Sequence, residues 1–131
     1  MYQDVRYLHY EDKKGEELID WFYRMLINWE AEKFVPSLRK NAQLEGVAQN
    51  EEISYSFASE IEKGDEEYFG DSGVVFYYFY PAEEEDTAVL LTNEEFFGVL
   101  QEKSEEYLQK HAEDRQEVAE LLEEIRKKLN V

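Results

Sequence analysis

The chain has 131 residues, of which 43% are hydrophobic and 15% aromatic, and its 32 acidic and 14 basic residues give a net charge of −18. This length predicts one domain over residues 1–131, and the aromatic content excludes a disordered acidic chain. The lack of cysteine excludes disulfides and thiolate metal sites, and because the sequence shows neither a signal peptide nor an apolar stretch near 20 residues, we expect a cytoplasmic protein without membrane contact.

The first third of the chain predicts helices after a short lead-in. Residues 2–10 partly alternate apolar and polar side chains, which favours either a short edge strand or an irregular lead-in, and Gly15 is expected to interrupt it. Glu16–Trp29 predict a helix because apolar side chains recur every three or four residues. Pro36 interrupts the apolar pattern that follows, and a second short helix is expected through about Leu44, with Gly46 as its C-terminal stop.

The middle of the chain predicts strands. Glu52–Ser59 alternate between apolar and small polar side chains, as in a half-buried strand. Val74–Tyr80 form an unbroken β-branched and aromatic run, which predicts a central strand with apolar side chains on both faces. Ala88–Leu91 complete a hairpin with it. Residues 60–72 are either a long connection or a ragged extra strand around Tyr68-Phe69.

Two helices are expected to close the chain. Thr92 and Glu95 have the spacing of a capping box at the start of the first helix, and a break near His111 precedes the last one. The predicted fold class is therefore α+β: an antiparallel β-meander of three strands, or four if the extra strand forms, packed with N-terminal helices and two C-terminal helices.

The acidic excess is confined to one part of the sequence. Residues 1–50 and residues 103–131 each have a net charge of −2, whereas residues 51–102 hold fifteen acids and one base, Lys63, for a net charge of −14. Acidic runs often serve solubility alone, and that interpretation stays open. Folding itself does not require this charge, because self-repulsion opposes compaction.

The alternative interpretation is a docking surface for a strongly basic protein. Carboxylates steer basic partners into encounter, and aromatic side chains act as desolvated anchors. Tyr68, Tyr77 and Phe79 are candidate anchors, provided that the N-terminal helices leave the second face of the central strand uncovered. The loops 60–72 and 81–86 lie at opposite ends of that strand, which limits how much of both one small partner can contact. The residues predicted to bind the partner are Glu60, Glu62, Asp65, Glu66, Glu67, Tyr68, Asp71, Tyr77, Glu83, Glu84, Glu85 and Asp86.

No pattern in the sequence predicts catalysis or a cofactor. The chain has two histidines, His9 and His111, and lacks a phosphate-binding glycine loop, HExxH and GxSxG. Residues 65–71 hold acids and a glycine but lack the alternating spacing of a calcium loop, so we expect no metal. The sign of the charge opposes direct binding of nucleic acid. We therefore expect a binding protein rather than an enzyme.

The C-terminal third resembles a known family. The segments that carry the resemblance are Glu94-Glu95-Phe96-Phe97, Tyr107-Leu108, His111-Ala112-Glu113-Asp114 and Leu121-Leu122-Glu123-Glu124-Ile125. They look like the closing helices of CdiI-type immunity proteins of contact-dependent inhibition and related polymorphic toxin systems, in the branch that neutralises ribonuclease toxins.

The resemblance implies a cytoplasmic protein that binds one cognate toxin domain and blocks its active site or its access to substrate. A ribonuclease toxin holds a phosphate backbone and is expected to be basic, so an inhibitor with a charge of −18 is electrostatically matched to it. The alternative is an acidic nucleic-acid mimic or adaptor that binds many basic proteins. A small enzyme would require a defined cleft.

Overall fold

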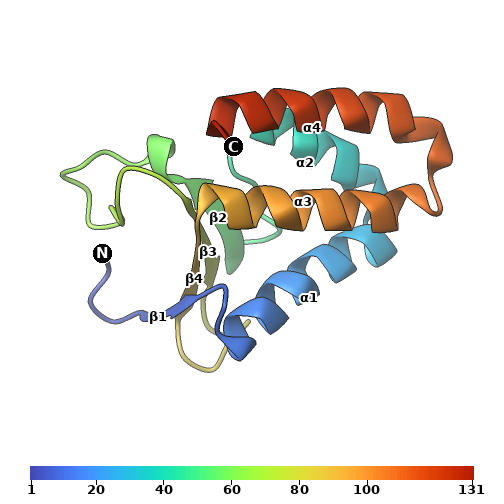
Figure 1. Ribbon diagram of the computed structural model, residues 1–131. Coiled ribbons are helices and arrows are strands. Elements are labelled where there is room, and N and C mark those ends of the chain that lie inside the picture. The colour runs from blue at the N-terminus through green and yellow to red at the C-terminus, as the bar shows by residue number, and fades with distance from the viewer.

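The computed structural model describes all 131 residues, Met1 to Val131 (Figure 1). A four-stranded sheet carries four helices on one of its faces, and the other face is covered only by chain without regular secondary structure. The elements in chain order are β1 (Arg6–His9), α1 (Lys13–Trp29), α2 (Phe34–Asn41), β2 (Ile53–Phe57), β3 (Val74–Tyr78), β4 (Thr87–Leu91), α3 (Asn93–Leu108) and α4 (Arg115–Leu129).

The sheet has the strand order β1-β4-β3-β2 and is mixed. Strands β2, β3 and β4 form the predicted antiparallel meander, with Tyr55 opposite Phe76 and Phe76 opposite Val89. The lead-in is an edge strand, and it corrects the purely antiparallel prediction because β1 runs parallel to β4, with Arg6 beside Thr87. Parallel neighbours need a long crossover, and here the helices α1 and α2 with two strands provide it.

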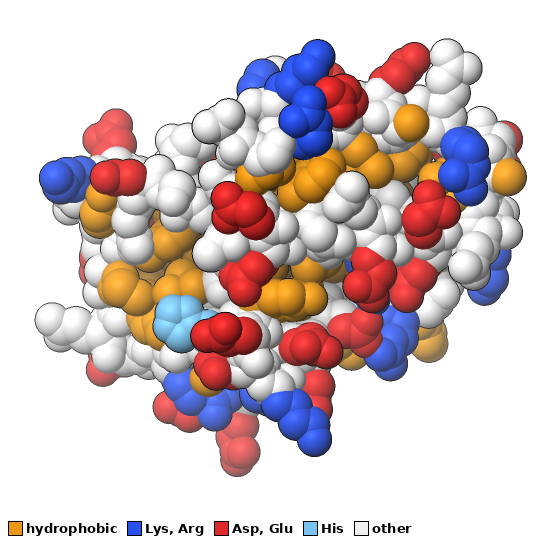
Figure 2. Space-filling model, viewed as in Figure 1, with side chains coloured by type: hydrophobic (Ala, Val, Ile, Leu, Met, Phe, Trp, Pro, Cys, Tyr) orange, Lys and Arg blue, Asp and Glu red, His pale blue; other side chains and the backbone are white.

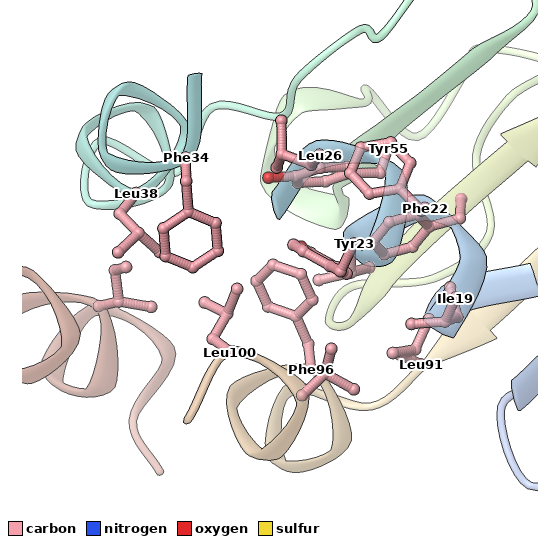
Figure 3. Packing of buried hydrophobic residues seen from close by; sticks show 14 of the residues in the cluster. Ile19, Phe22, Tyr23, Leu26, Phe34, Leu38, Tyr55, Leu91, Phe96 and Leu100 are labelled. Atoms are coloured by element: carbon pink, nitrogen blue, oxygen red, sulfur yellow. The ribbon is translucent and has the colours of Figure 1, made fainter. Parts of the chain in front are cut away.

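The core lies between the sheet and the helices and contains 26 buried residues. Its centre is aromatic: the Phe76 ring lies 4.5 Å from that of Tyr55, 5.3 Å from Phe22 and 6.2 Å from Phe96, measured between centroids. Figure 3 shows Phe22, Tyr55 and Phe96 converging from α1, β2 and α3. The alternation in β2 and β3 therefore delivers one aromatic layer to the helices.

The two glycines expected to interrupt the chain instead permit close approach. Gly15 lies inside the first turn of α1, where an added Cβ would lie 2.3 Å from the carbonyl oxygen of His9. At Gly46 an added Cβ would lie 1.8 Å from the carbonyl oxygen of Tyr55, which is why a side chain is not accommodated beside β2. Pro36 lies in the first turn of α2, where no helical N–H bond is lost.

The C-terminal helices begin and end as the sequence indicates. The Glu95 backbone N–H donates to the Thr92 hydroxyl at 3.1 Å and the Thr92 N–H donates to the Glu95 carboxylate at 2.9 Å, which confirms the capping box. The break between α3 and α4 falls at His111, whose ring stacks on Tyr107 with centroids 4.5 Å apart. Residues 68–69 form no strand. The structure contains no helix that combines the length and the apolar character of a membrane span.

Candidate protein-binding surface

The face of the sheet away from the helices, termed here the far face, has a small apolar cluster of its own. Val75 and Tyr77 of β3, Ala88 of β4 and Ile61 are its four buried members. The helices do not cover it. The N-terminal segment, residues 1–5, and the loop 60–72 lie over it with partly buried apolar side chains, namely those of Tyr2, Val5, Tyr68 and Phe69. The far face therefore presents loops rather than helices to solvent.

Tyr2 fastens the N-terminal segment to the loop 60–72. Its hydroxyl donates a 2.6 Å hydrogen bond to the carboxylate of Glu67, and its backbone N–H donates to the Tyr7 hydroxyl at 2.9 Å. Its ring packs edge-on against Tyr77 and Phe79, with centroids 5.9 and 6.4 Å apart. Burial and the neighbouring carboxylate raise the pKa of the Tyr2 hydroxyl, so it stays a donor at neutral pH.

An open hollow of about 500 Å³, termed here the acidic hollow, lies where these segments meet. It brings together acids from three parts of the chain: Asp4, Glu66 and Asp86. The expectation that the two acidic loops stay apart is thereby corrected, because the loop 60–72 folds back along the far face and reaches the other end of β3. The hollow is lined by Met1, Tyr2, Gln3, Asp4, Val5, Glu66, Phe79 and Asp86.

The four carboxylates of the β3–β4 turn do not share one environment. Glu83 forms an ion pair with Lys14 at 3.2 Å, and its side chain is only 18% exposed. Glu85 lies 3.8 Å from Arg6. Asp86 accepts the backbone N–H of Tyr80 at 2.8 Å, which closes the turn. Glu84 is exposed and has no ion-pair partner, so the turn is free to attract a partner mainly through Glu84 and the loosely paired Glu85.

The acids of the loop 60–72 divide in the same way. Glu60 accepts the backbone N–H groups of Phe57 at 2.8 Å and of Gly46 at 2.9 Å, so its carboxylate closes a turn. Asp71 accepts the Tyr68 hydroxyl, and Glu67 accepts that of Tyr2. The remaining three predicted acids are exposed and have no ion-pair partner: Glu62, Asp65 and Glu66.

The aromatic candidates occupy different depths. Tyr77 is 4% exposed, so it supports the surface from below and does not present a side chain to a partner. Its cover is the N-terminal segment, which the sequence patterns did not indicate. Phe79 stacks on Tyr77 at 5.3 Å and lines the acidic hollow. Tyr68 is half-buried, and its hydroxyl is held by Asp71.

Sequence reasoning missed two groups at this surface. Met1 is 53% exposed, and both Met1 and Asp4 line the acidic hollow. The positions of Met1 and Asp4 depend on the contacts of Tyr2, and no local sequence pattern predicts these contacts.

The charges of the far-face loops are less neutralised than those of the helices. Of the fifteen acids in residues 51–102, only Glu83, Glu85 and Glu102 lie within ion-pair distance of a base. Along the helices, Figure 2 shows basic side chains interspersed among the acidic ones, and bases there pair with acids, as Arg39 does with Glu117 at 2.7 Å. Negative potential is therefore least compensated in the middle part of the chain.

The histidines and carboxylates are distributed over several parts of the fold. No group of three or more histidines and carboxylates is placed to hold a metal ion. His9 lies in β1 and His111 in the break between α3 and α4, so they do not combine into one site. The acidic hollow offers carboxylate, aromatic and aliphatic groups to a partner.

Comparison with known proteins agrees with the resemblance of the closing helices and extends it. Searches of the curated proteins and of the solved structures found no match. The model of a protein family described as CDI immunity protein matches residues 15–122, which include strands β2, β3 and β4 and most of the helical residues. This chain belongs to the family of CDI immunity proteins, which neutralise a cognate toxin.

Proposed function

We propose that this immunity protein neutralises a basic nuclease toxin, in particular a ribonuclease, by binding its toxin domain stoichiometrically through the far face. The acidic hollow is the observation that carries the proposal. Three carboxylates from separate segments, Asp4, Glu66 and Asp86, meet there beside the apolar side chains of Met1 and Phe79. Such a surface offers charge complementarity and apolar contact area together.

A nuclease must hold a polyanion, so its substrate-binding surface is positively charged. Carboxylates that occupy this surface compete directly with phosphate groups for the same lysines and arginines. The toxin is then blocked by occlusion of its active site or of its substrate path, and the immunity protein needs no catalytic group of its own. Complementary charge also raises the rate of association, up to about 10⁸–10⁹ M⁻¹s⁻¹ at low salt.

The side chains expected to contact the toxin are those that no internal bond holds. Asp4, Glu62, Asp65, Glu66 and Glu84 are exposed and unpaired, and Glu85 is 63% exposed on its side chain beside Arg6. Asp86 lines the acidic hollow while it also accepts the backbone N–H of Tyr80. Glu60, Glu67 and Asp71 act mainly by holding the loop in shape, because each accepts hydrogen bonds from within the chain.

The test uses the toxin encoded immediately upstream of this protein. The variant carries four changes, Glu62→Gln, Glu66→Gln, Glu84→Gln and Glu85→Gln, and a matched control carries Glu45→Gln, Glu113→Gln, Glu120→Gln and Glu124→Gln, which remove the same charge at exposed sites elsewhere. We expect the far-face variant to associate with the toxin about tenfold more slowly at low salt and to lose most of its salt dependence. The control is expected to change the on-rate less than about threefold.

Equal effects of the two variants would mean that net charge rather than this surface steers the toxin, and the proposal would be wrong. If the wild-type protein did not protect cells that express this toxin, the proposed neutralisation of a nuclease toxin would be wrong. A nucleic-acid mimic would instead bind a panel of unrelated basic nucleases at physiological salt. A pull-down that retains only the cognate toxin would support the immunity function over the mimic.

A further inference from the structure

Both tryptophans of the chain lie on α1 and are exposed to solvent. Trp29 is 81% exposed and Trp21 is 37% exposed, and the partly buried Met25 lies between them. The three residues are spaced by four, so they form one row along the helix, termed here the tryptophan ridge. The buried side of α1, which faces the core through residues such as Ile19 and Tyr23, lies beside this row.

The fold does not cover this ridge. In Figure 1, α1 lies at the lower edge of the molecule and no helix or strand lies beyond it. Trp21 packs partly against Tyr78, with ring centroids 6.4 Å apart, whereas Trp29 makes no aromatic contact. Tryptophan is the residue most enriched at the energetic centres of protein interfaces, and an exposed one gains the most from a partner.

The charge around the ridge distinguishes it from the acidic hollow. Residues 13–33 hold five acids and four bases, a net charge of −1, although the whole chain carries −18. A strongly basic toxin has little electrostatic reason to prefer this nearly neutral segment. A second copy of the chain is strongly repelled at the far face, and it meets the least repulsion here.

We propose that two copies of this protein pair through the tryptophan ridge, with their α1 helices antiparallel about a two-fold axis at Met25. In this arrangement Trp21 of one copy packs against Trp29 of the other, and the two Met25 side chains meet. Two-fold pairing is the commonest form of self-association and uses the same patch on both copies. The acidic hollow lies on the other side of the sheet, so each copy keeps it free.

The pair is expected to dissociate readily. With 17 residues, α1 is about 25 Å long, and a contact along one such helix lies at the low end of the range of stable interfaces. Two charges of −18 also repel over a distance that salt shortens to about 8 Å at physiological ionic strength. Added salt should therefore strengthen this pairing, whereas it should weaken binding of a basic toxin.

The experiment is analytical ultracentrifugation of the full chain over a wide range of concentration, at low and high NaCl. We expect a monomer–dimer equilibrium that shifts toward the dimer at high salt. Trp29→Ala should weaken dimerisation at least about tenfold, and Tyr80→Ala, which removes a 70% exposed aromatic outside α1, should leave it unchanged. Thermal melts verify that both variants are folded.

A cross-linking experiment tests the two-fold geometry separately. The chain has no cysteine, so an introduced thiol reports one position only. Under glutathione disulfide, Met25→Cys is expected to form a covalent dimer much faster than Gln101→Cys, which lies exposed on α3. These readouts need no toxin, so their failure leaves the proposed nuclease inhibition unaffected.

Three results would overturn the proposal. One is a chain that stays monomeric at every concentration and salt. Another is equal behaviour of Trp29→Ala and Tyr80→Ala. The last is a monomeric chain whose toxin complex is weakened by Trp29→Ala and not by Tyr80→Ala, because the toxin would then occupy the ridge.

Discussion

The two faces of the sheet divide stability and recognition between them. The helix-bearing face contributes to a core of 26 buried residues, whereas the far face has four. Strand β3 serves both, because Phe76 points into the aromatic core and its neighbour Tyr77 lies under the N-terminal segment. The loops with uncompensated acids belong to the face that contributes less to the core. Carboxylates can therefore be concentrated where their repulsion disturbs the least packing.

The largest predicted effect is loss of core packing at Phe76. Phe76→Ala removes a fully buried ring that contacts aromatic side chains from α1, β2 and α3, and it should lower the free energy of unfolding by about 3–5 kcal/mol. Val75→Ala, one residue away on the far face, should cost only about 1–2 kcal/mol. Urea unfolding of both variants measures the contrast between the faces, and equal losses would show that the far face is as strongly packed as the core.

A smaller effect is expected at Lys103, which joins α3 to α1. Its side chain is 6% exposed and donates to Asp20 at 2.5 Å, with Glu106 at 3.2 Å. Lys103→Met keeps the stem and removes the charge, so both acids lose their buried partner. We expect a loss of about 2 kcal/mol at neutral pH, less than for a fully buried pair because the acids are partly solvated.

This loss should depend on pH in a defined direction. The hydrogen bond from Lys103, assisted by Arg24, lowers the pKa of Asp20 below its ordinary value of 3.8. A carboxyl whose pKa is lowered by folding stabilises the native state above its unfolded pKa, and the contribution disappears as the pH falls through the folded pKa. The stability difference between wild type and Lys103→Met should therefore be constant near neutral pH and shrink below about pH 4. A difference that grew in acid would contradict this assignment.

The far-face acids are expected to cost a little stability. The variant with glutamines at positions 62, 66, 84 and 85 should be more stable than wild type by about 0.5–1 kcal/mol at low salt, because unpaired like charges are removed. The gain should vanish at high salt. The control set at 45, 113, 120 and 124 should gain less, since bases are interspersed among the helical acids. Chemical unfolding at two salt concentrations measures both, and equal gains would mean that the repulsion is spread over the whole molecule.

The sequence predicted those parts of the fold that local periodicity specifies. Alternation located β2, unbroken apolar runs located β3 and β4, the spacing of apolar residues located α1, and Thr92 with Glu95 marked the start of α3. The direction of β1 was not predictable, because four residues carry no sign of which strand they will join.

The candidate surface was predictable in its charge and not in its shape. The acidic hollow exists because Tyr2 bonds to Glu67, a residue 65 positions away, and such contacts leave no local pattern. The separate roles of the acids were hidden for the same reason: Glu60 closes a turn through backbone N–H groups, whereas Glu66, in the same run of charge, is free.

The last predicted effect compares two adjacent tyrosines on opposite faces of β3. The Tyr78 hydroxyl donates to the carbonyl oxygen of Leu18 at 2.7 Å, so Tyr78→Phe removes a buried hydrogen bond and should cost about 1 kcal/mol. The Tyr77 hydroxyl is buried with no partner, and burial and the neighbouring hydroxyl of Tyr7 raise its pKa. Tyr77→Phe removes an uncompensated polar group and should leave stability unchanged or raise it by up to about 1 kcal/mol. Urea unfolding measures both changes. If Tyr77→Phe lowered the free energy of unfolding as much as Tyr78→Phe, the Tyr77 hydroxyl would have a hydrogen-bond partner in solution, and the buried polar groups of the far face would be as well hydrogen-bonded as those of the core.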